Sequence, residues 1–159
     1  MAAVHKFIKA RFSFVRQDLD EVLARLKDSD LLWSPAEGMR TIADQLLEIA
    51  NKEKEVLVWL QVGTWLDDGD DAFDLSSATV DGIRVTLSSL RVQTFAYIDS
   101  LTEAQLDELV PCAEGWWEAL RLTACPRGEI LRNIAAHEWY HTGQLLTYLW
   151  MRGDDPNAW

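Results

Sequence analysis

The sequence predicts an all-α protein: a four-helix bundle with long connections, formed by a single domain that covers residues 1–159. Apolar residues recur at alternating spacings of three and four in four separate segments, which is the period of an amphipathic helix. Stretches with Gly, Pro, Asp and Ser separate these segments. No segment has the alternation typical of a strand, and the length suffices for one hydrophobic core.

The first helix is predicted over residues 4–27 and the second from Thr41 onward. Pro35 and Gly38 lie in the connection between them. Thr41 and Asp44 resemble a capping box with Asp in place of Glu, which marks a helix start. The expected buried stripe of the first helix is Ile8, Phe12, Val15, Leu19, Val22 and Leu26. The stripe of the second helix is Ile42, Leu46, Ile49, Val56 and Leu60, with Glu53 among them.

The third helix is predicted over residues 77–101, after an acidic, turn-rich connection, and the fourth begins at Pro126. Proline costs little in the first turn of a helix, where its missing N–H would have no partner. Gly153 and Pro156 end the fourth helix. The third helix carries the stripe Ile83, Leu87, Leu90, Thr94, Tyr97 and Leu101. The fourth carries Ile130, Ile134, His137, His141, Leu145 and Tyr148. The long connections leave the order of the helices around the bundle open.

The charge balance argues against several classes of partner. The chain has 15 Lys and Arg against 26 Asp and Glu, which gives a formal net charge of −11. Nucleic acids and anionic membrane surfaces attract clustered cations, so we expect binding to neither. No run of about 18 apolar residues predicts a membrane span, and no uninterrupted apolar stretch predicts a signal peptide. Two cysteines do not make a disulfide framework, and the expected compartment is the cytoplasm.

His137 and His141 are the most informative pair of residues in the chain. They enclose the stretch "HEWYH", which has the H-E-x-x-H spacing of zinc peptidases. At about 100° per residue both imidazoles point into the bundle one turn apart, where one divalent ion can bind both. The alternative is a pair of core histidines that are hydrogen-bonded to Asn, Thr or backbone groups.

A peptidase is not expected, although the motif is shared with that class. Zinc peptidases need a third protein ligand and a substrate cleft beside the motif helix. Gln144 stands where one extended peptidase motif requires Gly, and no Glu follows His141 that could serve as the ligand of another type. No predicted strand could align a peptide beside the motif.

The third metal ligand must therefore come from another helix. His5 is the only other histidine and lies near the start of the first helix, where helices fray. The inner half of the second helix offers two carboxylates, with Glu53 inside the apolar stripe and Glu48 on its flank. Either one would complete a set of two imidazoles and a carboxylate, which suits one Zn, Ni, Mn or Fe ion with open positions.

Two long segments resemble the DinB-like superfamily, which includes proteins of the bacillithiol S-transferase type. They are "TIADQLLEIANKEKEVLVWL" and "GEILRNIAAHEWYHTGQLLTYL". Their most specific part is H-x-x-x-H-x-G-Q, formed by His137, His141, Gly143 and Gln144. The resemblance covers nearly the whole chain. It implies a bundle of DinB-like topology, a homodimer, and one divalent metal ion held by three histidines, one from the second helix and two from the last.

Glu48 stands where this resemblance places the histidine of the second helix. The resemblance therefore implies Glu48 as the third metal ligand beside the two histidines, whereas the helical wheel favours Glu53. Alternatively, the site has lost its affinity and the fold persists without metal. If Glu48 is the ligand, Glu53 is a buried acid that needs a partner from the first helix, such as Arg11 or Arg16.

Three residues near the histidines are candidates for catalysis: Glu138, Asn133 and Tyr140. Glu138 would be the general base of a zinc peptidase, but it lies about 100° from the histidine stripe. We therefore expect it on the helix surface or in support of a ligand. Asn133 faces inward one turn before His137, where it could orient substrate or serve as a satisfied core polar group. Tyr140 and Tyr148 could donate a proton, although aromatic residues in a bundle usually pack.

Residues of the connection before the fourth helix are weaker candidates. Trp116 and Trp117 could cover a pocket or lie in a dimer interface. Cys112 and Cys125 are minor candidates for metal ligands. Gly143 is expected to permit the close approach of a neighbouring helix.

The predicted function is that of a metal-dependent thiol S-transferase or hydrolase, in which the metal activates a thiol or a water. The resemblance implies this reaction class, with a small molecule as substrate and a low-molecular-weight thiol as cosubstrate. The alternative is a non-catalytic dimeric bundle with a vestigial or structural metal site, acting as a stress-associated binding module. Replacement of Glu48 distinguishes the two.

Overall fold

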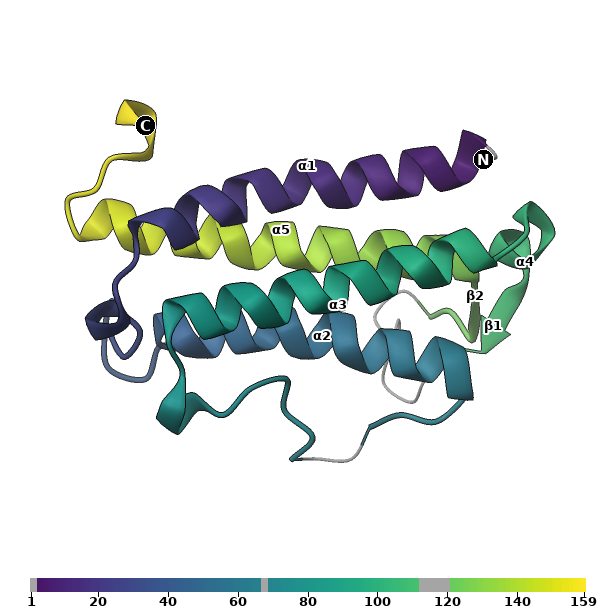
Figure 1. The fold of residues 1–159 in the computed structure, drawn as a ribbon, viewed down its shortest axis with the longest axis horizontal. Helices are drawn as coiled ribbons and strands as arrows, with labels where there is room; N and C mark the ends of the chain where they lie inside the picture. The colour runs from purple at the N-terminus through teal and green to yellow at the C-terminus, as the bar shows by residue number, and fades with distance from the viewer. Residues whose placement is uncertain (1–2, 67–68, 112–120) are drawn as a thin grey trace.

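Four long helices lie side by side in the computed structural model, which describes residues 3–66, 69–111 and 121–159 (Figure 1). Each long helix packs mainly against two of the others: α5 contacts α1 and α2, and α3 contacts the same two helices from the opposite side. The all-α bundle that the apolar periodicity predicts is therefore confirmed, and the order around it is α1, α5, α2, α3. The long helices are α1 (Ala3–Arg25), α2 (Ile42–Val62), α3 (Val80–Ser100) and α5 (Arg127–Met151).

Short elements occupy the connections, and two of them are strands that the sequence pattern does not predict. Strands β1 and β2 pair antiparallel, with Val110 opposite Cys125. Three residues per strand are too few to produce a recognisable alternation, and the pairing joins segments on either side of residues 112–120. The short elements are η1 (Asp28–Asp30), η2 (Leu75–Ser77), α4 (Glu103–Asp107), β1 (Leu109–Pro111), β2 (Ala124–Pro126) and η4 (Pro156–Ala158).

The start of α2 is fixed by the predicted capping box. Thr41 Oγ1 accepts a hydrogen bond from the Asp44 N–H at 3.1 Å, and Asp44 Oδ2 accepts one from the Thr41 N–H at 2.9 Å. At the other end, Gly63 adopts a left-handed conformation with φ of 79°, which ends the helix at low steric cost. These two caps fix where α2 begins and ends.

The third helix begins later than predicted, at Val80 instead of residue 77. Asp74 accepts a hydrogen bond from the Ser76 N–H, and this cap holds Leu75–Ser77 in a separate 3-10 turn. Thr79 then caps α3 through the Gly82 N–H. Pro126 lies just before α5 rather than inside its first turn.

The buried stripes form two apolar clusters, one towards each end of the bundle. Between them, each long helix contributes one charged residue to a set of ion pairs, and with Thr94 these residues form a group that we call the polar layer: Arg16, Glu53, Arg91, Thr94 and Glu138. The first cluster includes Leu19, Leu23, Ile42, Leu46, Ile83, Leu87 and Leu145. The second includes Ile8, Phe12, Val56, Ile98, Ile130 and Ile134. Among the described helices, none combines the length and the apolar character needed to cross a bilayer.

Candidate metal centre

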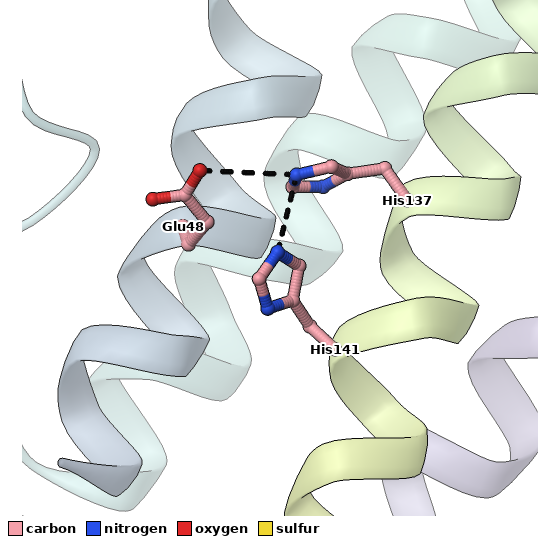
Figure 2. A group of neighbouring side chains, drawn as sticks. All are labelled: Glu48, His137 and His141. Carbon is pink, nitrogen blue, oxygen red and sulfur yellow. Dashed lines mark hydrogen bonds and ion pairs between the residues drawn. The ribbon is translucent and has the colours of Figure 1, made fainter. Parts of the chain in front are cut away.

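Glu48 from α2 approaches His137 and His141 from α5 (Figure 2). The Nε2 atoms of the two histidines lie 3.2 Å apart, and His137 Nε2 lies 3.8 Å from Glu48 Oε1. One ligand atom from each residue lies within 4.8 Å of the others. The three residues that the sequence pattern and the resemblance select are thus brought together.

The site lies at the edge of the contact between α2 and α5. His141 is 5 % exposed, whereas the side chains of His137 and Glu48 are 21 % and 35 % exposed. This position explains why the helical wheel favours Glu53, whereas the structure groups Glu48 with the histidines. Glu48 lies on the flank of the apolar stripe, and the flank is what borders an opening to solvent, whereas Glu53 is fully buried elsewhere.

The spacing and the charge state of the histidines fit a divalent ion. Two nitrogen ligands of a tetrahedral zinc ion, each at 2.0–2.1 Å, lie about 3.3 Å apart. Burial, the neighbouring His141 and the charges of Lys52 and Arg40 lower the pKa of His137 to about 3. Burial likewise lowers the pKa of His141, so both imidazoles are neutral at neutral pH, as a metal ligand must be.

Gln45 and Arg40 contact two of the three candidate ligands, and neither was among the candidates predicted from the sequence. The His141 Nδ1–H donates to Gln45 Oε1 at 2.5 Å. An Arg40 guanidinium nitrogen lies 2.9 Å from Glu48 Oε2, which leaves Oε1 on the side of His137. Gln45 lies one turn before Glu48 on the same helix face, and this spacing is the signal that could have identified it.

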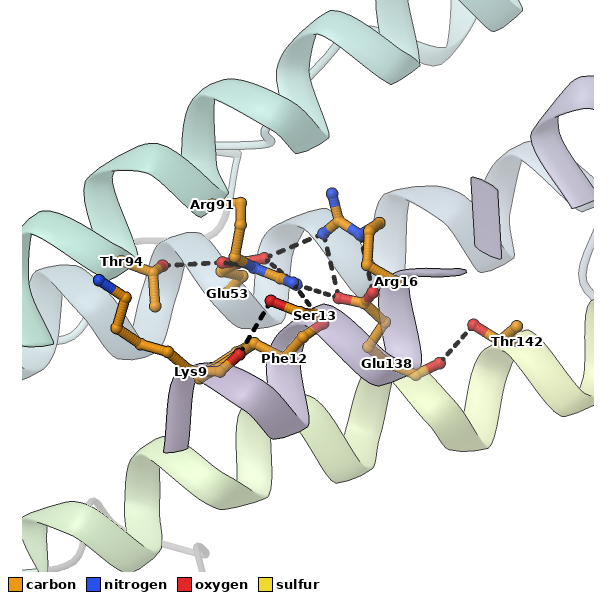
Figure 3. Close-up of polar contacts among 9 residues, drawn as sticks. All are labelled: Lys9, Phe12, Ser13, Arg16, Glu53, Arg91, Thr94, Glu138 and Thr142. Carbon is orange, nitrogen blue, oxygen red and sulfur yellow. Dashed lines mark hydrogen bonds and ion pairs between the residues drawn. The ribbon is translucent and has the colours of Figure 1, made fainter. Parts of the chain in front are cut away.

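Glu53 and Glu138, the two other acids that the sequence analysis considers, belong to the polar layer (Figure 3). Each of the four long helices contributes one charge to this layer. Arg91 Nε donates to Glu53 Oε1 at 2.9 Å, and Arg91 Nη2 donates to Glu138 Oε2. Arg16 Nε donates to Glu138 Oε1 at 2.8 Å, and Arg16 Nη2 lies 3.5 Å from Glu53 Oε2. Thr94 adds a hydrogen bond to Glu53 at 2.8 Å. Arg16 is thus one of the two expected partners of Glu53, and Arg91 is a partner that the sequence analysis missed.

The expectation of a surface position for Glu138 is wrong, because this side chain is 1 % exposed. Helix α5 has neighbours on two sides, so the residue 100° from the histidines meets α1 and α3 instead of water. Burial alone would lower the pKa of Arg16, but the hydrogen bond and charge of Glu138 and the charge of Glu53 raise it.

The remaining candidates lie around or outside the metal centre. Asn133 is half-buried one turn before His137. The exposed ring of Tyr140 meets the His141 ring edge-on, with centroids 5.0 Å apart. His5 Nε2–H donates to the Leu101 carbonyl at 2.7 Å, and this histidine is not part of the group formed by Glu48, His137 and His141.

Three further expectations concern Gly143, the cysteines and the tryptophans. The expectation for Gly143 is wrong, because an added Cβ would meet no atom within 4 Å, and the close approach occurs at Gly128 instead. Cys125 is buried in the second apolar cluster, away from the histidines. Cys112, Trp116 and Trp117 lie outside the described residues.

Comparison with solved structures supports the fold across the whole chain. A protein from Streptococcus pneumoniae matches with a TM-score of 0.71 at 16% identity, over 95% of this chain and 93% of that one. A conserved protein from Enterococcus faecalis matches with 0.68 at 14% identity, over 96% of each chain. An uncharacterized protein from Clostridium difficile 630 matches with 0.70 at 13% identity, over 93% of this chain and 96% of that one. At such identities these matches inform on the fold alone.

A family comparison covers the helices that carry the site. No protein with a curated description matches the chain. The model of the DinB superfamily matches residues 11–145, which include Glu48 and both candidate histidine ligands. The chain therefore belongs to the DinB superfamily.

Proposed function

We propose that this protein is a divalent-metal-dependent enzyme, a thiol S-transferase or hydrolase, whose metal ion is held by Glu48, His137 and His141. The observation that carries the proposal is the convergence of these three ligand atoms at an accessible edge of the bundle. A bound divalent ion would supply a Lewis acid that lowers the pKa of a thiol or a water at neutral pH.

The residues around the site suit a small anionic reactant. Arg40 is 52 % exposed beside Glu48, and Lys52 is near enough for its charge to act on both histidines. Because Arg40 pairs with Glu48 and Lys52 with Glu55, the cations offset the local carboxylates, which lowers the repulsion that a thiolate meets from a chain with a net charge of −11. The proposed cosubstrate is a low-molecular-weight thiol, and the proposed compartment is the cytoplasm, where such thiols are kept reduced.

The contact between Arg40 and Glu48 favours a second candidate function. A carboxylate that is already paired with a guanidinium does not need a metal ion to be stable. In that case the bundle is non-catalytic, the site is vestigial or structural, and the protein acts as a stress-associated binding module. The two functions differ in whether Glu48 contributes to metal affinity.

Metal content and affinity test the proposal directly. Protein purified without chelator should contain about one divalent ion per chain, and His137→Ala should lose it. Glu48→Gln should weaken Zn²⁺ binding at least tenfold, because the ligand charge is lost. Glu55→Gln is the matched control, since it makes the same change on α2 at a side chain of similar exposure, 27% against 35%.

Three outcomes decide between the candidates. Absence of metal from wild-type protein would exclude a metalloenzyme. Metal binding that survives Glu48→Gln would remove Glu48 from the ligand set. A Glu48→His variant that gains metal affinity and thiol-transfer activity, from a wild type with neither, would identify the natural protein as the non-catalytic form.

We further propose that two copies of the chain form a homodimer through the exposed face of α1 and α5. Phe14 and Trp139 are 58% and 54% exposed, and their rings meet edge-on at 6.4 Å. Exposed apolar side chains that cluster on adjacent helices are typical of a protein interface. Phe7 on α1 is 71% exposed and extends the same apolar character towards the start of the helix.

A further inference from the structure

The side chain of Gln45 lies between His141 and Tyr148, in a series of hydrogen bonds that ends on the main chain. His141 Nδ1 lies 2.5 Å from Gln45 Oε1. Gln45 Nε2 donates to Tyr148 Oη at 3.3 Å, and Tyr148 Oη donates to the Arg40 carbonyl oxygen at 3.2 Å. Gln45, Tyr148 and His141 are each at most 5% exposed, so water does not compete for these contacts.

The direction of every hydrogen bond in this series follows from its last acceptor. A main-chain carbonyl can only accept, so the Tyr148 hydroxyl donates to Arg40. The hydroxyl oxygen then accepts from the Gln45 NH₂ group, which turns the amide oxygen towards His141. Because an amide oxygen can only accept, His141 carries its proton on Nδ1.

This tautomer leaves the lone pair of His141 Nε2 facing His137 and Glu48. His137 lacks comparable support, because its Nδ1 atom is buried and has no hydrogen-bond partner among the described residues. The orienting contacts are therefore confined to one of the two imidazoles. Groups that fix the tautomer and rotation of a ligating histidine change metal affinity by about 10- to 100-fold.

We propose that Gln45, oriented by Tyr148 and the Arg40 carbonyl, is a positioning residue that fixes the tautomer and ring rotation of His141 for metal binding. The inference rests on the metal site proposed above. Gln45 precedes Glu48 by one turn of α2, so one helix face supplies both a ligand and the support of a second ligand.

A purely structural role for Gln45 makes different predictions. A buried amide needs hydrogen-bond partners in any protein, and its replacement changes stability wherever it lies. Such a role predicts no selective effect on the proton of His141. Measurements of the His141 tautomer and of the metal affinity therefore distinguish a positioning role of Gln45 from a purely structural one.

The tautomer can be read directly in metal-free, full-length protein. The chain contains three histidines, so their labelled imidazoles can be assigned in one long-range proton–nitrogen NMR spectrum. We expect the His141 proton on Nδ1 in the wild type and in Gln45→Glu, which keeps an acceptor. In Gln45→Leu, which has none, a large fraction should move to Nε2.

Zinc affinity, measured by competition with a chelator, provides the second readout. Gln45→Leu should bind Zn²⁺ about 10- to 100-fold more weakly, and Gln45→Glu should bind it about as tightly as the wild type. Tyr148→Phe, which removes the acceptor of the amide NH₂, should give a smaller loss. Ile49→Val is the control for lost packing, because it trims a buried side chain on the same helix and should change neither readout.

The outcomes distinguish this inference from the function on which it rests. If wild-type protein binds Zn²⁺ but carries the His141 proton on Nε2, Gln45 does not position the ring. Unchanged Zn²⁺ affinity in Gln45→Leu would overturn the role as well. Should Gln45→Leu fail to fold, the wild-type tautomer and the affinity of Tyr148→Phe still decide the question. Wild-type protein that binds no Zn²⁺ would instead overturn the metal site itself.

Discussion

His137 and His141 face each other through their Nε2 atoms, 3.2 Å apart, with ring planes inclined by 60°. Because His141 donates from Nδ1 to Gln45, the proton shared between the two Nε2 atoms belongs to His137. A divalent cation between the two atoms would require His137 to hold its proton on Nδ1 instead, so that both Nε2 lone pairs face the ion. Such binding therefore needs a change of tautomer in His137 but none in His141.

The low pKa of His137 predicts a specific pH dependence of stability. The folded-state pKa is about 3, whereas an unfolded histidine titrates near 6.5. Between these values the unfolded chain binds more protons, so stability that is present above pH 6.5 is lost as the pH falls. The free energy of unfolding of metal-free protein should drop by at most about 1.4 kcal/mol per pH unit from this group.

Urea unfolding at pH 5 to 7 measures this effect, with His137→Gln as the comparison. The variant should lose less stability than the wild type between pH 6.5 and 5, because the titrating group is gone. Parallel curves for the two proteins would show that the imidazole is not shielded in the folded state.

The polar layer predicts a large difference between two identical substitutions on α5. Glu138→Gln leaves Arg16 and Arg91 with one buried carboxylate between them, which should cost about 3–5 kcal/mol. Glu129→Gln removes a carboxylate that is 53% exposed and whose ion pair among the described residues is with Arg132, which should cost less than about 1 kcal/mol. Chemical denaturation of both variants tests this contrast, and similar losses would contradict a buried charge network.

Two helix caps predict equal losses of stability but unequal effects on metal binding. Thr41→Ala and Thr79→Ala each remove a side-chain acceptor for an N–H of the first turn, at a cost of about 1 kcal/mol. Thr41 follows Arg40, whose carbonyl and guanidinium contact Tyr148 and Glu48, so only Thr41→Ala should also weaken Zn²⁺ binding. Thermal unfolding and titration calorimetry measure the two effects, and an equal loss of affinity in both variants would contradict this link.

The proposed dimer predicts which exposed apolar residue matters for assembly. Wild-type protein should sediment as a dimer, and Trp139→Glu should sediment as a monomer because it places a charge in the apolar face of α1 and α5. Val92→Glu on α3 is the control, since that side chain is 70% exposed on another helix. A wild-type monomer, or dissociation by Val92→Glu alone, would reject the proposed interface.

The sequence predicts the helices and the proximity of His137 and His141 well, because both depend on local periodicity. The stripe from Ile8 to Leu26 is buried as expected, as is the stripe from Ile130 to Tyr148 except for the partly exposed His137, and Thr41 caps α2 as expected. A spacing of four along one helix suffices to bring two imidazoles together. The register of the family resemblance selects Glu48, and this is the carboxylate that the structure groups with them.

The burial of Glu138 and the partners of Glu53 and His141 could not be predicted from the sequence, because they depend on contacts between distant segments. The angle of Glu138 from the histidines predicts a surface position, but a helix that packs against two neighbours buries more than one stripe of residues. Arg91 lies on α3, and nothing local marks it as the partner of Glu53. Apart from its spacing along α2, nothing in the sequence around Gln45 distinguishes it from other polar residues, because its hydrogen-bond partner Tyr148 is more than 100 positions away.

The polar layer has a consequence for the alignment of the helices along their axes. Sliding one helix by a single turn, about 5.4 Å, would carry its charge into an apolar cluster and leave its partners unpaired. An all-apolar core would tolerate such a slip more easily, since one aliphatic side chain can replace another. The layer thus excludes the neighbouring alignments and keeps Glu48 on α2 level with His137 and His141 on α5.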